Sequence, residues 1–150
     1  MKRAPALHAG VVGSVPAEPG AYVLGLLLAR PVALRVGGAA CTLPAGRYLY
    51  CGSARGPGGL RARVTRHLAR RKRIHWHVDR LTTRGRVVAV WIAPGGDECA
   101  LVRDLAGLPV PLPGFGSSDC RRCASHLLGW PDDCSDPGVR FPASVFRLFA

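Results

Sequence analysis

The stretch that decides the fold is residues 48–67, which read YLYCGSARGPGGLRARVTRH. Its first seven residues carry aromatic and apolar side chains and end at Gly-Ser, which is typical of a strand that stops at a turn. The Gly- and Pro-rich residues 55–59 predict a loop. From Leu60 onward, apolar and basic side chains recur at helical spacing. A strand therefore leads through a short loop into a basic helix.

This order of elements brings polar side chains toward one place. Tyr50 lies at the end of the predicted strand, while Arg63 and His67 are four residues apart on the predicted helix. Side chains at this spacing lie on the same face of a helix. We therefore expect Tyr50, Arg63 and His67 to converge.

Further strands are predicted on both sides of this stretch. Residues 20–28 form a nearly continuous apolar run, which indicates a central strand buried on both faces. Residues 32–36 predict a second strand that ends at a Gly-Gly turn, and residues 47–51 belong to a third. Residues 87–92 are almost all β-branched or aromatic and predict another strand. The sequence therefore supplies enough strands for a small sheet.

The remaining elements are shorter. Residues 98–105 predict a helix with Asp97 as its N-cap. Residues 75–81 fit a short helix, which would set His75 beside Asp79, or a strand with His75, His77 and Asp79 on one face. We favour the helix. A helical turn is also expected within residues 119–128, and a short strand or coil within 140–149.

These elements predict one domain of the α/β (α+β) class, with a small mixed or antiparallel sheet flanked by helices. At 150 residues the chain is long enough to bury a core of its own. Residues 1–18 read as a loosely held lead-in, residues 19–107 as the core, and residues 108–150 as a Cys/His-containing extension that packs on the core.

The charge predicts a polyanionic partner. The net charge is +12, from 21 Lys and Arg against 9 Asp and Glu. A basic excess of this kind favours nucleic acid, although a high pI also occurs in proteins for which it only aids solubility. The candidate phosphate contacts cluster around the basic helix and its exit: Arg55, Arg61, Arg66, Arg70, Arg71, Lys72, Arg73, His75 and His77.

Six cysteines and the absence of a secretion signal or an apolar membrane span predict a cytoplasmic protein with no membrane association, in which thiols are free or bind metal. Cys120, Cys123 and His126 stand at Cys-x-x-Cys-x-x-His spacing, which suits three positions of a structural zinc site. Cys99 or Cys134 is available as the fourth ligand. The alternative is that these cysteines are ordinary small buried side chains.

Four motifs occur in an order that resembles a known superfamily. They are Gly20-Ala21-Tyr22, Tyr50-Cys51-Gly52, the helix with Arg63 and His67, and Glu98 at the start of a later helix. Together they resemble the GIY-YIG nuclease superfamily. A little-characterised GIY-YIG-like branch is resembled still more closely, through residues 48–54, 75–79, 98–99 and 114–120. The segment between the first two motifs is longer than in the usual nucleases, so we expect an extra strand and hairpin there.

The resemblance implies a metal-dependent endonuclease that hydrolyses phosphodiester bonds in DNA. It implies that Glu98 holds Mg²⁺ or Mn²⁺, that Arg63 braces the phosphate, and that Tyr22 or Tyr50 orients or deprotonates the water. His67 would assist the tyrosine or act as the base. Two other readings remain open at this point: a catalytically inactive module that binds nucleic acid, and a zinc-stabilised interaction protein with an RNA partner.

Overall fold

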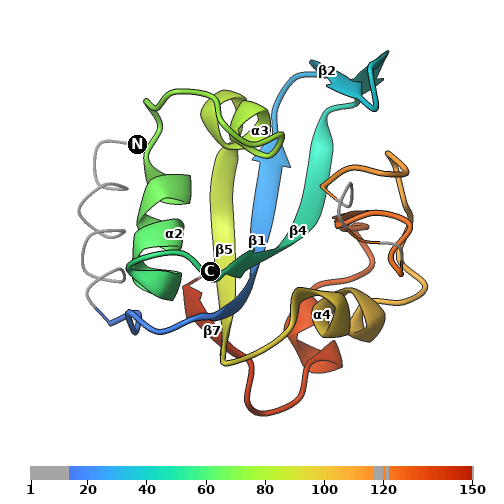
Figure 1. The fold of residues 1–150 in the computed structure, drawn as a ribbon. Coiled ribbons are helices and arrows are strands. Elements are labelled where there is room, and N and C mark those ends of the chain that lie inside the picture. The colour runs from blue at the N-terminus through green and yellow to red at the C-terminus, as the bar shows by residue number, and fades with distance from the viewer. Residues whose placement is uncertain (1–13, 117–119, 121, 150) are drawn as a thin grey trace.

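The computed structural model describes residues 14–116, 120 and 122–149. They form a five-stranded antiparallel sheet with the strand order β6-β4-β1-β5-β7 and a separate two-stranded hairpin, with helices packed around them (Figure 1). The sheet consists of β1 (Gly20–Leu28), β4 (Gly46–Ala54), β5 (Arg86–Pro94), β6 (Leu127–Gly129) and β7 (Phe146–Phe149). The hairpin is β2 (Val32–Val36) and β3 (Ala39–Leu43), and the helices are α2 (Gly59–Leu68), α3 (Asp79–Arg84), α4 (Glu98–Asp104) and the 3₁₀ helix η1 (Pro137–Arg140). The predicted fold class is confirmed.

β1 is the central strand because apolar side chains cover both of its faces. Tyr22 and Leu24 belong to one core cluster, and Ala21 and Val23 belong to the other. Gly25 interrupts the apolar run for a steric reason, since a Cβ there would lie 2.8 Å from the Trp130 ring. The central place predicted for residues 20–28 is therefore confirmed.

The helices divide between the two faces of the sheet. Leu60 and Val64 of α2 and Leu81 of α3 pack in the cluster that contains Tyr22. Leu101 of α4 packs in the opposite cluster, beside Trp91. Residues of α2 and α4 therefore approach the sheet from opposite faces.

The C-terminal residues belong to the sheet itself. β6 pairs with β4, and β7 pairs with β5, so the residues after 108 supply both edge strands. Of the lead-in, residues 1–13 lie outside the described residues. The described part is anchored, because Val15 is fully buried and the Glu18 carbonyl accepts the Leu60 N–H at 2.9 Å at the start of α2.

Three local predictions need correction. The second strand of the expected hairpin, residues 39–43, had no predicted bounds, because its Ala-Ala-Cys-Thr sequence is weakly patterned and the strand forms only by pairing with β2. The helix expected over 75–81 begins instead at Asp79, because the Asp79 carboxylate accepts backbone N–H groups of the preceding turn. The helical turn expected within 119–128 is absent from the described residues of that range, where β6 pairs with the edge of β4. The extra hairpin before β4 is confirmed.

Within the part of the chain described here, no helix has the length and apolar character needed to span a membrane.

Candidate functional site

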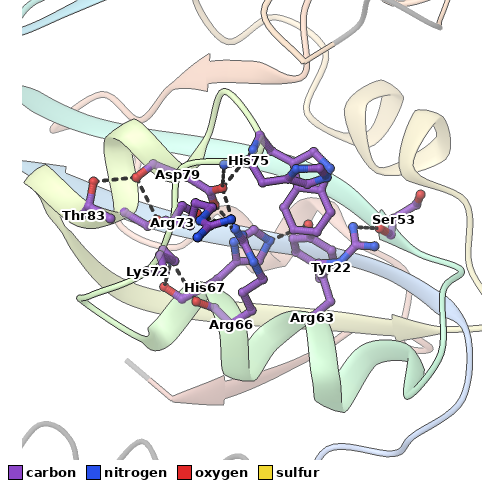
Figure 2. A network of polar contacts seen from close by, with 12 residues as sticks. Tyr22, Ser53, Arg63, Arg66, His67, Lys72, Arg73, His75, Asp79 and Thr83 are labelled. Carbon is purple, nitrogen blue, oxygen red and sulfur yellow. Dashed lines mark hydrogen bonds and ion pairs between the residues drawn. The ribbon is translucent and has the colours of Figure 1, made fainter.

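A buried tyrosine and histidine form the inner part of the site. Tyr22 projects from β1 and His67 from α2, and the tyrosine hydroxyl lies 2.7 Å from His67 Nε2 (Figure 2). Both side chains are almost completely buried, at 1% exposure each. Burial, reinforced by the nearby Lys72 ammonium, lowers the pKa of His67 to about 3. His67 is therefore a neutral imidazole at physiological pH.

Gly52 makes room for this pair. It lies directly across from Tyr22 in the β1–β4 ladder, and a Cβ at position 52 would collide with the tyrosine ring and hydroxyl. The second motif therefore needs a glycine at this position for a steric reason, because the Tyr22 ring lies against the backbone of β4.

Arg63 borders the site on the α2 side. Its Nη1 donates to the Ser53 carbonyl oxygen at 2.8 Å, and its guanidinium lies 4.2 Å from the centre of the Trp76 ring. A hollow of about 200 Å³ opens beside these two side chains, lined also by the loop before α2. Arg63 therefore presents a fixed positive charge at the edge of an open space.

Tyr50 is the more accessible of the two tyrosines. It is half-buried on β4, with its ring 6.4 Å from that of Tyr22 and edge-on to Phe115 at 6.1 Å. A Cβ at Gly116 would lie 3.0 Å from the Tyr50 ring, so the C-terminal segment closes tightly over it. Phe115 was not singled out as a site residue, since an isolated aromatic in an irregular segment gives no such signal.

Glu98 enters the site from α4. Its carboxylate is 28% exposed, and Oε2 lies 3.5 Å from Nδ1 of His126. Its negative charge acts on both Tyr22 and Tyr50 and disfavours their ionisation. The structure thus brings Tyr22, Tyr50, Arg63, His67 and Glu98 into one neighbourhood although they come from four different elements.

The tyrosine hydroxyls are held in their neutral form. Burial raises the pKa of Tyr22 well above its usual value, and the Tyr50 and Glu98 charges add to the effect while Arg63 opposes it. The pKa of Tyr50 is also raised, by burial first and then by Glu98. Both hydroxyls can therefore donate and accept hydrogen bonds, and their ionisation at neutral pH needs an additional positive charge nearby.

A second group of polar residues stands beside the site and is internally satisfied (Figure 2). Asp79 is fully buried and accepts two hydrogen bonds from Arg66, at 2.6 and 2.8 Å, and one each from the backbone N–H groups of His75 and Trp76, both at 2.8 Å. Burial alone would raise its pKa, but these donors outweigh burial and lower the pKa of Asp79 to about 2. Asp79 thus anchors the turn that precedes α3.

This network engages two residues predicted to contact nucleic acid. Besides binding Asp79, Arg66 donates to the Arg73 carbonyl at 2.9 Å. Lys72 Nζ donates to the carbonyls of Arg66 and His67 at 2.8 and 3.0 Å, which closes the C-terminal end of α2. The other predicted contacts stay on the surface: Arg55, Arg61, Arg70, Arg71, Arg73, His75 and His77 are exposed, although Arg61 Nε also donates to the Val15 carbonyl at 2.7 Å.

The second predicted constellation also assembles. Candidate ligand atoms of Cys99, Cys120, Cys123 and His126 all lie within 4.8 Å of one another, and the Cys99 and Cys120 sulfurs are 3.4 Å apart. Such a Cys₃His group can bind a metal ion such as zinc. Of the two candidates for the fourth ligand, Cys99 belongs to the group and Cys134 does not.

The thiols in this group compete for ionisation. Burial and hydrogen bonds from Cys99 to Cys120 and Cys123 raise the pKa of Cys99 to about 12. The Arg122 backbone, the His126 ring and the Cys99 thiol stabilise the Cys120 thiolate and lower the pKa of Cys120 to about 6. One thiolate is therefore favoured at neutral pH, and a bound cation would be needed to stabilise three.

A family model described as "Domain of unknown function DUF123" matches residues 21–139. No curated protein and no solved structure matches the chain.

Proposed function

The chain belongs to the family described as Domain of unknown function DUF123, and we propose that it is a metal-dependent endonuclease that hydrolyses phosphodiester bonds in DNA. The proposal rests on the resemblance of its motifs to the GIY-YIG superfamily. One structural observation supports it most: a fixed arginine, a partly exposed carboxylate and two tyrosine hydroxyls act on one another, and the arginine lines an open hollow.

The reaction needs three kinds of group. Water attacks phosphorus, the bond from phosphorus to the leaving oxygen breaks, and the proton of the water ultimately reaches the solvent or the leaving oxygen. Positive charge must stabilise the phosphate oxygens, and a polar group must align the water. The residues of this site supply one candidate for each task.

Glu98 is the residue that would hold Mg²⁺ or Mn²⁺. The donor chemistry fits, because Mg²⁺ prefers oxygen ligands and is commonly anchored by one or two carboxylates, with water and substrate phosphate as its other ligands. The 28% exposure of Glu98 leaves its carboxylate open to such partners. When bound, the ion would polarise the phosphate and favour ionisation of the attacking water.

Arg63 would bind the scissile phosphate. Its guanidinium is held by the Ser53 carbonyl and lies over Trp76, so little side-chain freedom remains to be lost on binding. Its charge remains available, because the Ser53 carbonyl that accepts from it is a neutral group. It would stabilise the negative charge that grows on the phosphate oxygens.

Tyr50 is the better candidate to contact the attacking water, because it is the more exposed of the two tyrosines. Tyr22 would support the site from behind through its hydrogen bond to His67. Since His67 is buried and neutral, we infer that it acts through Tyr22 and not directly on the water. Arg63 is the nearby cation that makes a tyrosine hydroxyl more acidic.

The exposed basic residues would hold the DNA backbone. Arg55, Arg70, Arg71 and Arg73 lie on the surface in the segments before and after α2, the helix that carries Arg63. Contacts of this kind are independent of sequence and are weakened by salt.

The test is a cleavage panel with single-stranded, duplex, flap and branched DNA and matching RNA, in Mg²⁺ or Mn²⁺. Wild-type protein should cleave at least one DNA substrate. Arg63→Ala should lower the rate by about 10² to 10³, the loss typical for removal of one oxyanion-stabilising group. Arg70→Ala, which removes an exposed arginine of the same region, should keep the rate constant at saturating DNA.

Two outcomes would replace the proposal. Tight DNA binding without cleavage by any preparation would support the catalytically inactive binding module. Selective binding of RNA without cleavage would support the interaction protein.

A further inference from the structure

We propose that a zinc ion bound by Cys99, Cys120, Cys123 and His126 orients Glu98, because His126 links the metal centre to the carboxylate. The functional role of this link rests on the proposed function, since Glu98 is the carboxylate of the proposed nuclease site. The structural claim itself, one zinc ion joined to Glu98 through an imidazole, can be tested without nuclease activity.

The donor set suits zinc. Ligand atoms about 2.0–2.3 Å from a tetrahedral zinc ion are roughly 3.3–3.8 Å from one another. The four candidate donors already lie within 4.8 Å of one another, so only small side-chain rotations separate them from that geometry. Three sulfurs and one imidazole complete four-coordination, which describes a closed structural site and leaves no position for a substrate.

His126 carries an independent sign of a missing partner. Its side chain is 2% exposed, and neither ring nitrogen makes a hydrogen bond among the described residues. A neutral imidazole has one N–H donor and one acceptor nitrogen, and burying both without a partner is costly. A metal ion on one nitrogen and an acceptor on the other would satisfy both.

The neighbours of the ring assign the two nitrogens. Nδ1 faces the Glu98 carboxylate, with Oε2 at 3.5 Å, so Nε2 is left for the metal. In this arrangement Nδ1 carries the proton and donates to Glu98 after a small closing movement. Carboxylates that accept from a metal-bound histidine fix its tautomer and strengthen its binding to the metal.

The backbone around His126 holds the ring in place. Its N–H donates to the Phe115 carbonyl at 2.9 Å, and its carbonyl accepts from Cys51 N at 2.9 Å, next to Tyr50 on β4. The imidazole is therefore fixed relative to the strand that carries Tyr50. A zinc ion that fixes the His126 ring therefore also fixes the position of the Nδ1–H group that donates to Glu98.

The adjacent residue gives the metal a second hold on Glu98. Cys99 follows Glu98 in the first turn of α4, where the Asp97 carboxylate caps the Cys99 N–H at 3.3 Å. α4 has only seven residues, so its own hydrogen bonds do little to fix its start. Zinc bound to Cys99 would tie this turn to the segment that carries Cys120, Cys123 and His126.

The decisive experiment measures zinc affinity in the full chain by competition with a chelator under reducing conditions. Purified wild-type protein should contain close to one zinc ion per chain. Glu98→Ala should weaken zinc binding by about 10- to 100-fold, as expected when a carboxylate that supports a ligand is lost. Glu98→Gln should weaken it less, because the amide oxygen still accepts from Nδ1–H.

Matched controls separate this effect from a general one. Glu18→Ala removes an exposed carboxylate away from the cluster and should leave zinc affinity unchanged. Cys134→Ser should also leave it unchanged, whereas Cys99→Ser should abolish tight binding. Equal zinc affinity of wild type and Glu98→Ala would overturn the link, and zinc-free protein with a Cys99–Cys120 disulfide would overturn the site.

The Mg²⁺ requirement of cleavage is a second measurement. A zinc ion that only stabilised the fold would not change it. Zinc-depleted protein that remains folded should need more Mg²⁺ for half-maximal cleavage while its DNA affinity stays the same. An unchanged Mg²⁺ requirement would contradict the orienting role. If no preparation cleaves DNA, the proposed function fails, and the zinc affinity of Glu98→Ala still decides this inference.

Discussion

The polar groups around Asp79 and those around His126 are buried to a similar degree but are satisfied in opposite ways. Every oxygen of the Asp79 carboxylate receives donors from Arg66 or from the backbone of the turn before α3. The His126 ring has no hydrogen-bond partner among the described residues, and the thiols beside it hydrogen-bond only weakly to one another.

The difference separates a structural role from a binding role. A network whose charges and donors already match stabilises the loop that contains it and has no capacity left for a ligand. A cluster of three partly buried thiols and one buried imidazole without a hydrogen-bond partner has that capacity. Both groups lie near Tyr50, so the site is held by the protein itself around Asp79 and, as we propose, by a metal around His126.

Removal of the metal should have the largest effect. Chelator treatment or Cys120→Ser should lower the melting temperature by on the order of 10 °C, because structural zinc contributes directly to folding free energy. The measurement is thermal unfolding before and after zinc is added back. Cys41→Ser, which changes a cysteine of the β2–β3 hairpin, should lower the free energy of unfolding by no more than about 1 kcal/mol. An identical melting temperature with and without chelator would contradict the expected role of the cluster.

Loss of the Asp79 charge should have the next largest effect. Asp79→Asn leaves Arg66 without a counter-charge and should lower the free energy of unfolding by roughly 3 kcal/mol. Denaturant unfolding measures it, with the exposed Asp133→Asn as the control. Zinc affinity should be unaffected, and a variant as stable as wild type would show that the network contributes little.

Acid should weaken the same network in a defined range. The pKa of Asp79 is about 2 in the folded protein and close to about 3.9 in an unfolded chain. Because the folded pKa is the lower one, the stability from this group is complete above about pH 4 and is lost as the pH falls through about 2. The expected loss is roughly 2 to 3 kcal/mol. Unfolding curves measured at decreasing pH should show this loss of stability in wild type and not in Asp79→Asn.

The smallest change caused by a single substitution concerns the salt dependence of DNA binding. If about six phosphates are contacted, DNA affinity should fall by about 10³ between 50 and 200 mM salt. Arg70→Ala should reduce the slope of log affinity against log salt by about one. Arg66→Ala should leave the slope unchanged, because Asp79 already neutralises Arg66, while it lowers stability. A slope that Arg66→Ala reduces as much as Arg70→Ala would mean that Arg66 contacts DNA.

Elements with strong local patterns were predictable from the sequence. The apolar run of β1, the β-branched β5, the helix that begins near Leu60 and the Asp97 cap all formed as expected. β3 and β6 were not, because a strand of three residues such as β6 exists only through its pairing with β4. The start of α3 at Asp79 depends on donors from the preceding turn and from Arg66, which no local pattern reveals.

The candidate site was predictable as a set of residues but not as a geometry. The motifs identified Tyr22, Tyr50, Arg63, His67 and Glu98, and the spacing identified Cys120, Cys123 and His126. The choice of Cys99 over Cys134 required the chain to fold, because 21 residues separate Cys99 from Cys120. The contact between Glu98 and His126, which joins the two constellations, likewise arises only when α4 and the C-terminal segment meet.

The most direct test of the account compares wild type with Glu98→Gln in single-turnover DNA cleavage with Mg²⁺ and protein in excess. Glu98→Gln keeps the size and hydrogen-bonding oxygen of the side chain but removes its charge. We predict that it loses most of the cleavage while its DNA affinity and melting temperature stay close to wild type, because the exposed arginines and the core are unchanged. Full wild-type cleavage by Glu98→Gln would show that this carboxylate does not hold the metal and that the site assignment is wrong.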